Sequence, residues 1–506
     1  MQYNPESVNQ LKAKNRKYYK QTTTKEQKNH PIGEKSKKSR FLIFSLIYSI
    51  RVKKMKYEIE QTDEIISNNT GLVLVNNIME STNFKQKINN KNYLKVQSRE
   101  ITNKDIFMSY IGILAQGRTE FERADEYRKN QYFKQALDIE KSPSCSILRQ
   151  RFNAIGEIES NLKDMKKLID ETNVEILQTK NVELTPCYQK CVPLDIDVTP
   201  MDNSGSKKEG VSYTYKKVEG FAPIMAYIGT EGYLMRSELR EGKAHGQCAK
   251  TICFLKETID LAKQTTKEPL LVRTDCAHDC SDNVLLFTEK EVEFLMKKKN
   301  IVADKPEFYF HEAQEKGRKK ETREGKERYL YSYEKIYVCK KEEGASINIP
   351  VRIVVDAIRR TSKPDGQILL MPEYECKRYV TSLQEASEEE IIELYHLHAT
   401  SEQFHSEIKT DMDIERLPSG KFSTNEIVLG LGGMVYNILR LIGQINCKLE
   451  TSKKRVIERK RIKTVIKDMI MLASKLVKHA RKEVIKIYKE EYQIEIFRKV
   501  YKLSYA

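Results

Sequence analysis

Two short apolar runs in the middle of the sequence each end in an aspartate. "VPLDIDVT" alternates around Asp195 and Asp197, and "PLLVRTD" leads to Asp275. Between them, "FAPIMAYIG" and "GYLMRSELREG" are separated by Gly229 and Gly232, as expected for a hairpin, and a helical stretch follows over roughly 246 to 263. Strands, then a helix, then another strand predict a mixed α/β sheet over residues 190–299.

Residues 300–385 have the pattern of a β-rich insert. "RYLYSYEKIYVC" alternates strictly, which places Tyr329, Tyr331 and Tyr333 on one face, and "KPDG" marks a turn. The hydrophilic run "QEKGRKKETREGKER" is expected to be an exposed loop. The insert is therefore predicted to be all-β.

The region before the predicted sheet, residues 58–165, reads as helical. "NKDIFMSYIGILAQG" has helical apolar spacing and stops at Gly117, while "SPSCSILRQRFNAIG" carries Arg149 and Arg151 away from its apolar side. Short helices with exposed arginines suit a helix-turn-helix-like DNA-binding region. An ordinary helical subdomain explains the same pattern.

The net charge of +17 is unevenly distributed, with basic segments at both ends and a net acidic centre. This distribution suits binding to a phosphate backbone outside a carboxylate-rich site, although a solubilising tail has the same composition. Residues 1–57 are expected to be a basic, disordered extension, and Met55 is a candidate start of the folded protein. Their apolar run "FLIFSLIYSI" is too short to cross a bilayer, which takes about 20 residues.

The helical pattern returns after residue 385. "TNEIVLGLGGMVYNILRLIGQI" is strongly apolar, but Asn437 and Arg440 lie inside it, so a buried core helix is expected rather than a membrane span. The last segment, residues 447–506, is basic and predicted to be helical.

Three acidic residues stand out as candidate metal ligands: Asp197, Asp275 and Glu402. Carboxylates at the ends of neighbouring strands can converge, and a helix can supply a third. Such oxygen ligands bind Mg²⁺ or Mn²⁺, and two ions about 4 Å apart would support in-line attack on a phosphodiester. The alternative for each acid is a strand-end cap or a solvated carboxylate.

The segment "YHLHATSEQFHSEIK" places other polar side chains at helical spacing from Glu402. In one continuous helix, Tyr395, His398, Glu402 and Lys409 would share a face about 60° wide, at about 100° per residue. A carboxylate on this face would meet metal, and the His and Lys would meet phosphate oxygens. The competing interpretation is zinc bound by His398, Glu402 and His405, which lacks both a nearby Cys and an HExxH arrangement. The ten cysteines form no CxxC pair and are expected to be reduced thiols.

These stretches resemble the DDE transposases of bacterial insertion sequences, in the group with a Y-x2-R-x3-E-x6-K signature. "LDIDVT" and "LLVRTDCAHD" are similar to the two aspartate strands, and "YHLHATSEQFHSEIK" is similar to the signature. "DIERLPSGKFSTNEIVLGLGGMVYNILRLIGQ" and "RIKTVIKDMIMLASKLVKHARK" resemble the segments that follow it. The similarity covers roughly residues 60–505 and does not include the first 57.

The resemblance implies an RNase H-like catalytic domain interrupted by the β-rich insert, with Asp197, Asp275 and Glu402 binding two Mg²⁺ or Mn²⁺ ions. It also implies that Tyr395 and Lys409 hold the DNA strand near the cut. His398 departs from the family, which has Arg there; His is charged only part of the time near neutral pH. The chain has no Trp, so any base held by the insert would need Tyr or Phe, with the Tyr329–Tyr331–Tyr333 face as a candidate and cross-strand packing as the alternative.

The sequence therefore predicts a transposase that binds terminal inverted repeats and target double-stranded DNA as a homodimer, in the cytoplasm at the nucleoid and without a membrane. Two alternatives remain: a catalytically inactive DNA-binding derivative, and a nuclease without strand transfer. The predicted segments are an extension (1–57), a helical DNA-binding region (58–165), two parts of the catalytic core (190–299 and 386–446), the insert (300–385) and a basic C-terminal segment (447–506).

Overall fold

The computed structural model describes residues 60–90, 100–244, 249–300, 305–341, 344–449, 459–488 and 493–505. The chain divides into two units, Met1–Asp63 and Glu64–Ala506. The predicted extension over residues 1–57 lies outside the described residues, which fall almost entirely in the second unit.

The first part of this unit is helical, as predicted. Its helices begin at the polar caps that the sequence offers: Thr102 accepts a hydrogen bond from Asp105 N, and Ser144 accepts one from Ile147 N. The rings of Phe107, Tyr110, Phe121 and Phe152 pack together between the helices. The elements are β1 (Ile65–Ser67), α3 (Leu72–Glu80), α4 (Phe84–Asn90), α5 (Asn103–Leu114), η1 (Phe121–Arg123), α6 (Ala124–Tyr127), α7 (Gln131–Ala136), α8 (Cys145–Gly156) and α9 (Glu159–Thr179).

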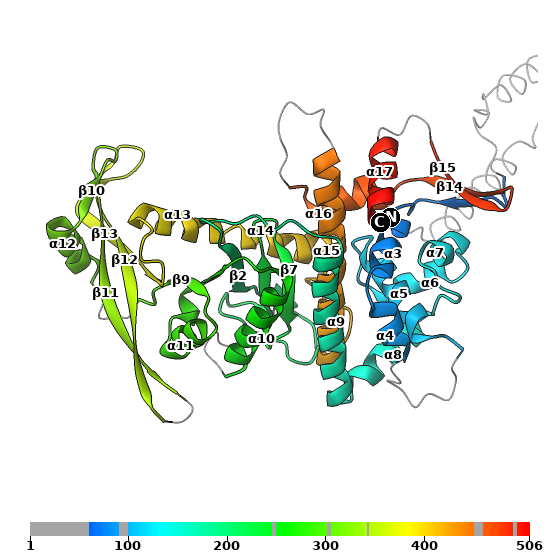
Figure 1. Ribbon diagram of the computed structural model, residues 1–506, viewed down its shortest axis with the longest axis horizontal. Helices are drawn as coiled ribbons and strands as arrows, with labels where there is room; N and C mark the ends of the chain where they lie inside the picture. The colour runs from blue at the N-terminus through cyan, green and yellow to red at the C-terminus, as the bar shows by residue number, and fades with distance from the viewer. Residues whose placement is uncertain are drawn as a thin grey trace, which may run out of the picture. The chain divides into compact units, whose positions relative to one another are not determined.

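A nine-stranded sheet has the order β10-β11-β12-β13-β9-β8-β2-β6-β7, which confirms the predicted mixed α/β class. In Figure 1 its insert strands β10–β13 lie at the left and β2 and β7 lie in the middle. β2 pairs in parallel with β8, and β8 in parallel with β9, whereas β6 and β7 are antiparallel additions beside β2. Parallel neighbours place the ends of β2 and β8 at the same edge. These elements are β2 (Val192–Val198), β6 (Ile224–Ile228), β7 (Tyr233–Glu238), α10 (Ala249–Thr265), β8 (Leu270–Thr274), η2 (Cys276–His278), α11 (Ser281–Glu289) and β9 (Glu293–Lys297).

The insert extends the same sheet, because β13 pairs antiparallel with β9. It is β-rich but not all-β, since it begins with a helix, α12. The predicted exposed loop over residues 314–328 was wrong: it contains the end of α12, strand β10 and the start of β11. The elements are α12 (Pro306–Lys316), β10 (Arg318–Lys320), β11 (Lys326–Lys340), β12 (Ser346–Ser362) and β13 (Ile368–Thr381).

α12 covers the tyrosine face of β11. Tyr329 and Tyr331 are buried, the ring of Tyr329 meets Phe310, and the Tyr331 hydroxyl donates a 2.6 Å hydrogen bond to Glu312 Oε2. These contacts fit the packing alternative, because a buried ring has no free face for a base.

The segment predicted as one helix over residues 395–409 is interrupted. α13 (Glu388–His398) starts at a capping box on Ser387, and α14 (Ser401–Ser406) follows after a break. At the break, Glu402 N bonds to Ala399 O, three residues back, and a π-turn, η3 (Glu407–Asp411), follows. Tighter and wider turns shift the angular positions of residues, so Tyr395 and Glu402 do not share an ideal helical stripe.

The apolar helix α15 (Phe422–Leu449) is long and apolar enough to cross a membrane, but 89% of its most apolar stretch is buried within the protein. The predicted buried core helix is confirmed. Asn437 joins it to the sheet: its side chain accepts a 2.7 Å hydrogen bond from Leu234 N and donates one of 2.7 Å to Leu234 O.

The C-terminal segment is not wholly helical, so that part of the predicted fold was wrong. It contains a hairpin, β14–β15, whose first strand pairs with β1 from the start of the unit. The partner strand lies about 400 residues away in sequence, which no local pattern reveals. The elements are α16 (Ile462–Val465), η4 (Ile466–Ile470), β14 (Ser474–His479), β15 (Lys482–Ile487) and α17 (Ile494–Tyr505).

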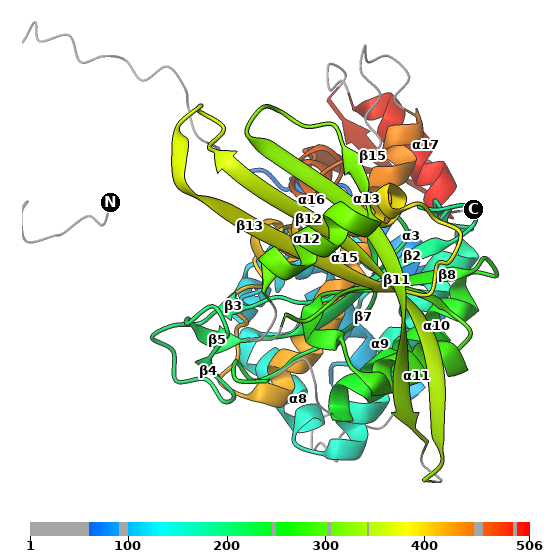
Figure 2. The same ribbon diagram turned by 90° about the vertical axis from the view of Figure 1, so that its left-hand side faces the viewer.

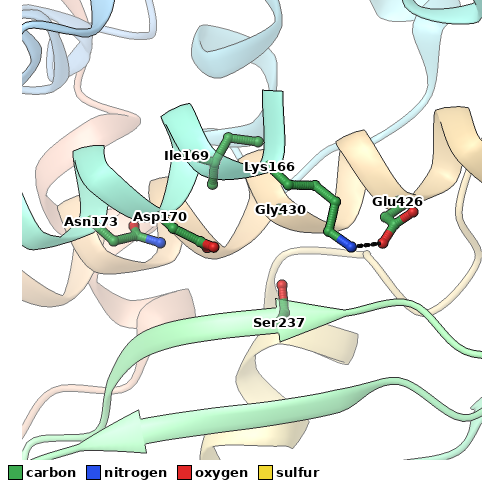
Figure 3. Close-up of a pocket in the computed structure, with 7 residues that line it drawn as sticks. All are labelled: Lys166, Ile169, Asp170, Asn173, Ser237, Glu426 and Gly430. Carbon is green, nitrogen blue, oxygen red and sulfur yellow. Dashed lines mark hydrogen bonds and ion pairs between the residues drawn. The ribbon is translucent and has the colours of Figure 1, made fainter. Parts of the chain in front are cut away.

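A small polar cavity lies where α9, α15 and β7 pack together (Figure 3). Lys166 and Glu426 form a 2.5 Å ion pair across it. Asp170 also lines it, with only 15% of its side chain exposed and Arg236 Nε 3.3 Å from its carboxylate. Burial raises the pKa of Asp170 from 3.8 to about 7, in spite of the opposing charges of Arg236 and Lys166. Asp170 is therefore protonated more readily in the folded chain than in the unfolded chain.

We expect the contribution of Asp170 to the free energy of unfolding to fall as pH rises from about 4 to about 7, because the folded state binds the Asp170 proton more tightly. Each unit of pKa shift corresponds to about 1.4 kcal/mol. Asp170→Asn should lack this fall, whereas Asp164→Asn on the same helix should keep it. Urea unfolding at a series of pH values measures both; equal pH dependence in wild type and Asp170→Asn would contradict the prediction.

Candidate active site

Asp197 and Asp275 lie at the edge of the sheet where β2 and β8 end. In the parallel register Ile196 is opposite Thr274. Asp197 and Asp275, the next residue on each side, therefore lie at the ends of neighbouring strands. Burial raises the pKa of Asp197, and the charge of Asp275 raises it further against the opposing charge of His398. The two carboxylates thus repel each other, which is the electrostatic setting in which a bound cation is favourable.

His278 orients the Asp275 carboxylate. Asp275 caps η2 and accepts hydrogen bonds at Oδ1 from Ala277 N (3.1 Å) and His278 Nδ1 (2.8 Å). Burial would raise the pKa of Asp275, but these bonds and the imidazole outweigh it and hold the pKa below its ordinary value. The sequence prediction did not include His278, although the run "TDCAHD" places it three residues after Asp275.

Glu402 is exposed in the first turn of α14. The hydroxyl of Tyr215 connects it to the aspartates, because this pKa is raised to about 12 by burial and then by the charges of Asp197, Asp275 and Glu402. The charges of all three predicted carboxylates therefore act on the Tyr215 hydroxyl. Within the part of the chain that the structure describes, however, no group of three His, Cys, Asp or Glu side chains is close enough to hold a metal ion.

The three acids nevertheless fit a hard divalent cation. Their donor atoms are all carboxylate oxygens, the ligands that Mg²⁺ and Mn²⁺ prefer, and the pKa of Asp197 is raised by burial and by the charge of Asp275. The zinc alternative of His398, Glu402 and His405 likewise forms no metal-ligand group among the described residues. His405 is buried and Nδ1 lies 3.9 Å from Asp197 Oδ2, with its pKa lowered to about 3 by burial and by the charge of His398.

A buried ion pair links β2 and β8, the two strands that lead to Asp197 and Asp275. Arg273 on β8 donates two 2.7 Å hydrogen bonds to the carboxylate of Asp195 on β2, and both residues are 2% exposed. Arg273 also donates to Leu394 O on α13 (2.8 Å), and His398 Nδ1 lies 2.8 Å from Asp195 Oδ1. The network thus fixes β2, β8 and α13 together. Sequence reasoning missed Arg273, whose only signal was a charged residue inside an apolar strand.

The three residues expected to contact DNA beside Glu402 are in contact with protein. His398 is 6% exposed and bonded to Asp195, while Tyr395 is half-buried against the ring of Tyr379. Lys409 Nζ donates to Pro200 O (2.6 Å) and lies 3.1 Å from Glu415 Oε1. Their contacts with phosphate stay predictions.

The two arginines of the predicted DNA-binding region differ in exposure. Arg149 is 43% exposed and pairs with Glu122. Arg151 is half-buried, and it donates hydrogen bonds to Asn103 Oδ1 and Ile101 O. Of the two, Arg149 is the more accessible to a ligand; DNA binding by either residue stays a prediction.

The chain belongs to the family described as transposase DDE domain group 1, whose model matches residues 50–504. Among solved structures, the chain is similar to a piggyBac transposase in a synaptic complex with hairpin DNA, with 11% identity over 79% of this chain and 78% of that chain. The TM-score of 0.37 does not establish a shared fold. A search of curated proteins finds no match. Family membership makes the chain a transposase.

We expect Arg273→Ala to lower the free energy of unfolding by about 3–5 kcal/mol, because it leaves the Asp195 charge buried without its main partner. Arg149→Ala removes an exposed pair and should cost less than about 1 kcal/mol. Urea denaturation followed by circular dichroism measures both. Replacing the pair with apolar residues (Asp195→Leu with Arg273→Met) should cost less than Arg273→Ala alone; the reverse order would contradict a charge effect.

Proposed function

We propose that the protein is the transposase of a DNA insertion sequence, which binds terminal inverted repeats as a homodimer, hydrolyses the element ends and joins them to target DNA. The observation that carries this proposal is the placement of Asp197 and Asp275 at the ends of the parallel neighbours β2 and β8, in a chain that belongs to the transposase family. In the joining step the freed 3′-hydroxyl attacks a target phosphorus, a new phosphodiester forms, and the target strand leaves with a 3′-hydroxyl.

Asp197, Asp275 and Glu402 would hold two Mg²⁺ or Mn²⁺ ions. When bound, such ions polarise a phosphodiester and lower the pKa of water. The surrounding residues serve positioning: His278 and Ala277 N orient the Asp275 carboxylate, and the Asp195–Arg273 pair keeps the two strand ends adjacent. Tyr395, His398 and Lys409 would bind the DNA strand after leaving some of their present contacts.

The order of the central strands supports an RNase H-like catalytic domain. Without the insert, the sheet has the order β9-β8-β2-β6-β7. Strands β9, β8 and β2 are parallel neighbours, and only β6, in the hairpin, runs opposite to β2. We assign this domain to residues 190–299 and 386–446, separated by the insert of residues 300–385. The helical region (58–165), including Arg149 and Arg151, and the basic segment (447–506) would bind double-stranded DNA at the nucleoid in the cytoplasm.

A second candidate is a DNA-binding derivative that has lost catalysis. It is favoured by one observation: His398, where the family has Arg, lies inside the protein on Asp195. A nuclease without strand transfer is a third, and it would cut the ends without joining them.

We expect Glu402→Gln to abolish cutting and leave binding to the element ends intact, because the change removes a charge and preserves the shape of the side chain. Asp197→Ala should also abolish cutting. Purified protein, Mg²⁺ and a plasmid carrying the gene with its flanking DNA provide the assay, with nicks mapped at the element boundaries. Glu393→Gln is the matched control, since Glu393 is an exposed glutamate on α13.

Boundary cuts by wild type and Glu393→Gln alone would support the proposal. End binding without cuts by wild type would favour the inactive derivative. Cuts without joined products would favour the nuclease, and loss of binding in Glu402→Gln would mean that Glu402 is structural.

A further inference from the structure

A short hairpin is hydrogen-bonded to the end of β2, at the residue after Asp197, and carries exposed aromatic and basic side chains. It belongs to a small sheet with the order β3-β5-β4, made of β3 (Met201–Asp202), β4 (Ser212–Tyr213) and β5 (Glu219–Phe221) (Figure 2). Tyr213 and Tyr215 are 67% and 66% exposed, and Lys216 and Lys217 follow them, also exposed. Two large rings exposed to this extent on one turn are not explained by core packing.

The hairpin is firmly held at its base. A Cβ atom on Gly220 would lie 1.9 Å from Met201 O, and one on Gly242 would lie 2.1 Å from Ser212 O, so the backbones approach as closely as glycine allows. The ring of Phe221 meets Phe422 with centroids 6.0 Å apart. The exposed rings therefore extend from an anchored support.

The turn itself is also ordered by its own hydrogen bonds. Thr214 is buried, its N donates to Val218 O (2.9 Å), and its hydroxyl donates to the same oxygen (3.0 Å). Lys217 N donates to Thr214 O (2.9 Å). Because Thr214 faces inward, its two tyrosine neighbours both face outward.

Tyr215 links the hairpin to the site. Its hydroxyl donates a 3.3 Å hydrogen bond to Val198 O, the residue after Asp197, and the charges of Asp197, Asp275 and Glu402 all act on it. The hydroxyl is thus held at the residue that follows Asp197, while Tyr215 as a whole stays 66% exposed. A nucleotide next to the reacting phosphate would lie within reach of that ring.

The positive charges beside the two tyrosine rings indicate the class of ligand. Lys216 Nζ lies 5.9 Å from the centre of the Tyr215 ring, and Lys217 is exposed beside it. Aromatic faces next to ammonium groups match the alternation of bases and phosphates in single-stranded nucleic acid, in which the faces of unpaired bases are accessible. In duplex DNA those faces are covered by stacking.

We propose that the β4–β5 hairpin binds unpaired DNA at the active site, with Tyr213 and Tyr215 stacking on bases and Lys216 contacting the adjacent phosphate. This inference rests on the proposed function, because it assigns the strand that the carboxylates would act on. It makes the hairpin a holder for the separated strand end during cutting and joining.

The test uses two hairpin oligonucleotides with the same duplex stem, one blunt and one with a 3′ single-stranded thymine extension that contains 2-aminopurine. Full-length protein is titrated into each in EDTA, with anisotropy reporting affinity and 2-aminopurine quenching reporting stacking. The variants are Tyr215→Ala, Tyr213→Ala, Tyr215→Phe and Lys216→Ala. Tyr505→Ala is the control, because Tyr505 is 77% exposed and lies on α17.

We expect wild type to bind the extended oligonucleotide more tightly and to quench it. Tyr215→Ala should lose about 5- to 150-fold in affinity for this oligonucleotide alone, together with the quenching. Tyr215→Phe should behave as wild type, since it keeps the ring. Lys216→Ala should reduce the salt dependence of binding by about one phosphate contact.

Equal affinity and quenching in wild type and both Tyr→Ala variants would overturn the inference. A change in sedimentation of these variants without a change in DNA binding would also overturn it, and would assign the hairpin to a protein interface. The boundary-cutting assay separates the two proposals: cutting without stacking contradicts only the hairpin, and stacking without cutting contradicts only the transposase reaction.

Discussion

The buried pair between Asp195 and Arg273 is the interaction on which the site depends. Its two charged groups are almost completely buried, and each lies on a different strand of the parallel pair that leads to Asp197 and Asp275. Charges at this depth are tolerated only when their hydrogen bonds are satisfied, so the geometry of the pair tolerates little displacement. Through Leu394 O and His398 the same pair also positions α13, which precedes Glu402.

A second group of charges fixes the far end of α14. Glu407 in the π-turn pairs with Arg440 of α15 and with Arg459, and Asp411 accepts bonds from Arg461 and from Lys463 N. The basic C-terminal segment is therefore not only a candidate DNA-binding surface. Some of its arginines hold the helix that carries Glu402, so the sequence far beyond the signature contributes to the site.

Much of the fold could be predicted because its signals are local. The alternation in "VPLDIDVT", the glycines of the β6–β7 hairpin and the polar residues inside α15 all act within a few positions of the chain. The break between α13 and α14 was missed because a shift from one turn type to another leaves the apolar spacing intact. The β1–β14 pairing was missed because it joins opposite ends of the unit. Asp197 and Asp275 were predicted as metal ligands from their places at strand ends, whereas the buried partners Arg273 and His278 become recognisable only when the strands are adjacent.

The polar residues of α15 also affect whether this helix can insert into a membrane while the chain is being synthesised. A helix of this length and hydropathy, emerging before its partners have folded, has the composition that membrane insertion machinery accepts. An arginine near the middle of such a helix opposes insertion by about 2.5–3.5 kcal/mol on biological scales. Arg440, which joins α15 to Lys460 in the folded protein, therefore also makes insertion of this helix into a bilayer less favourable.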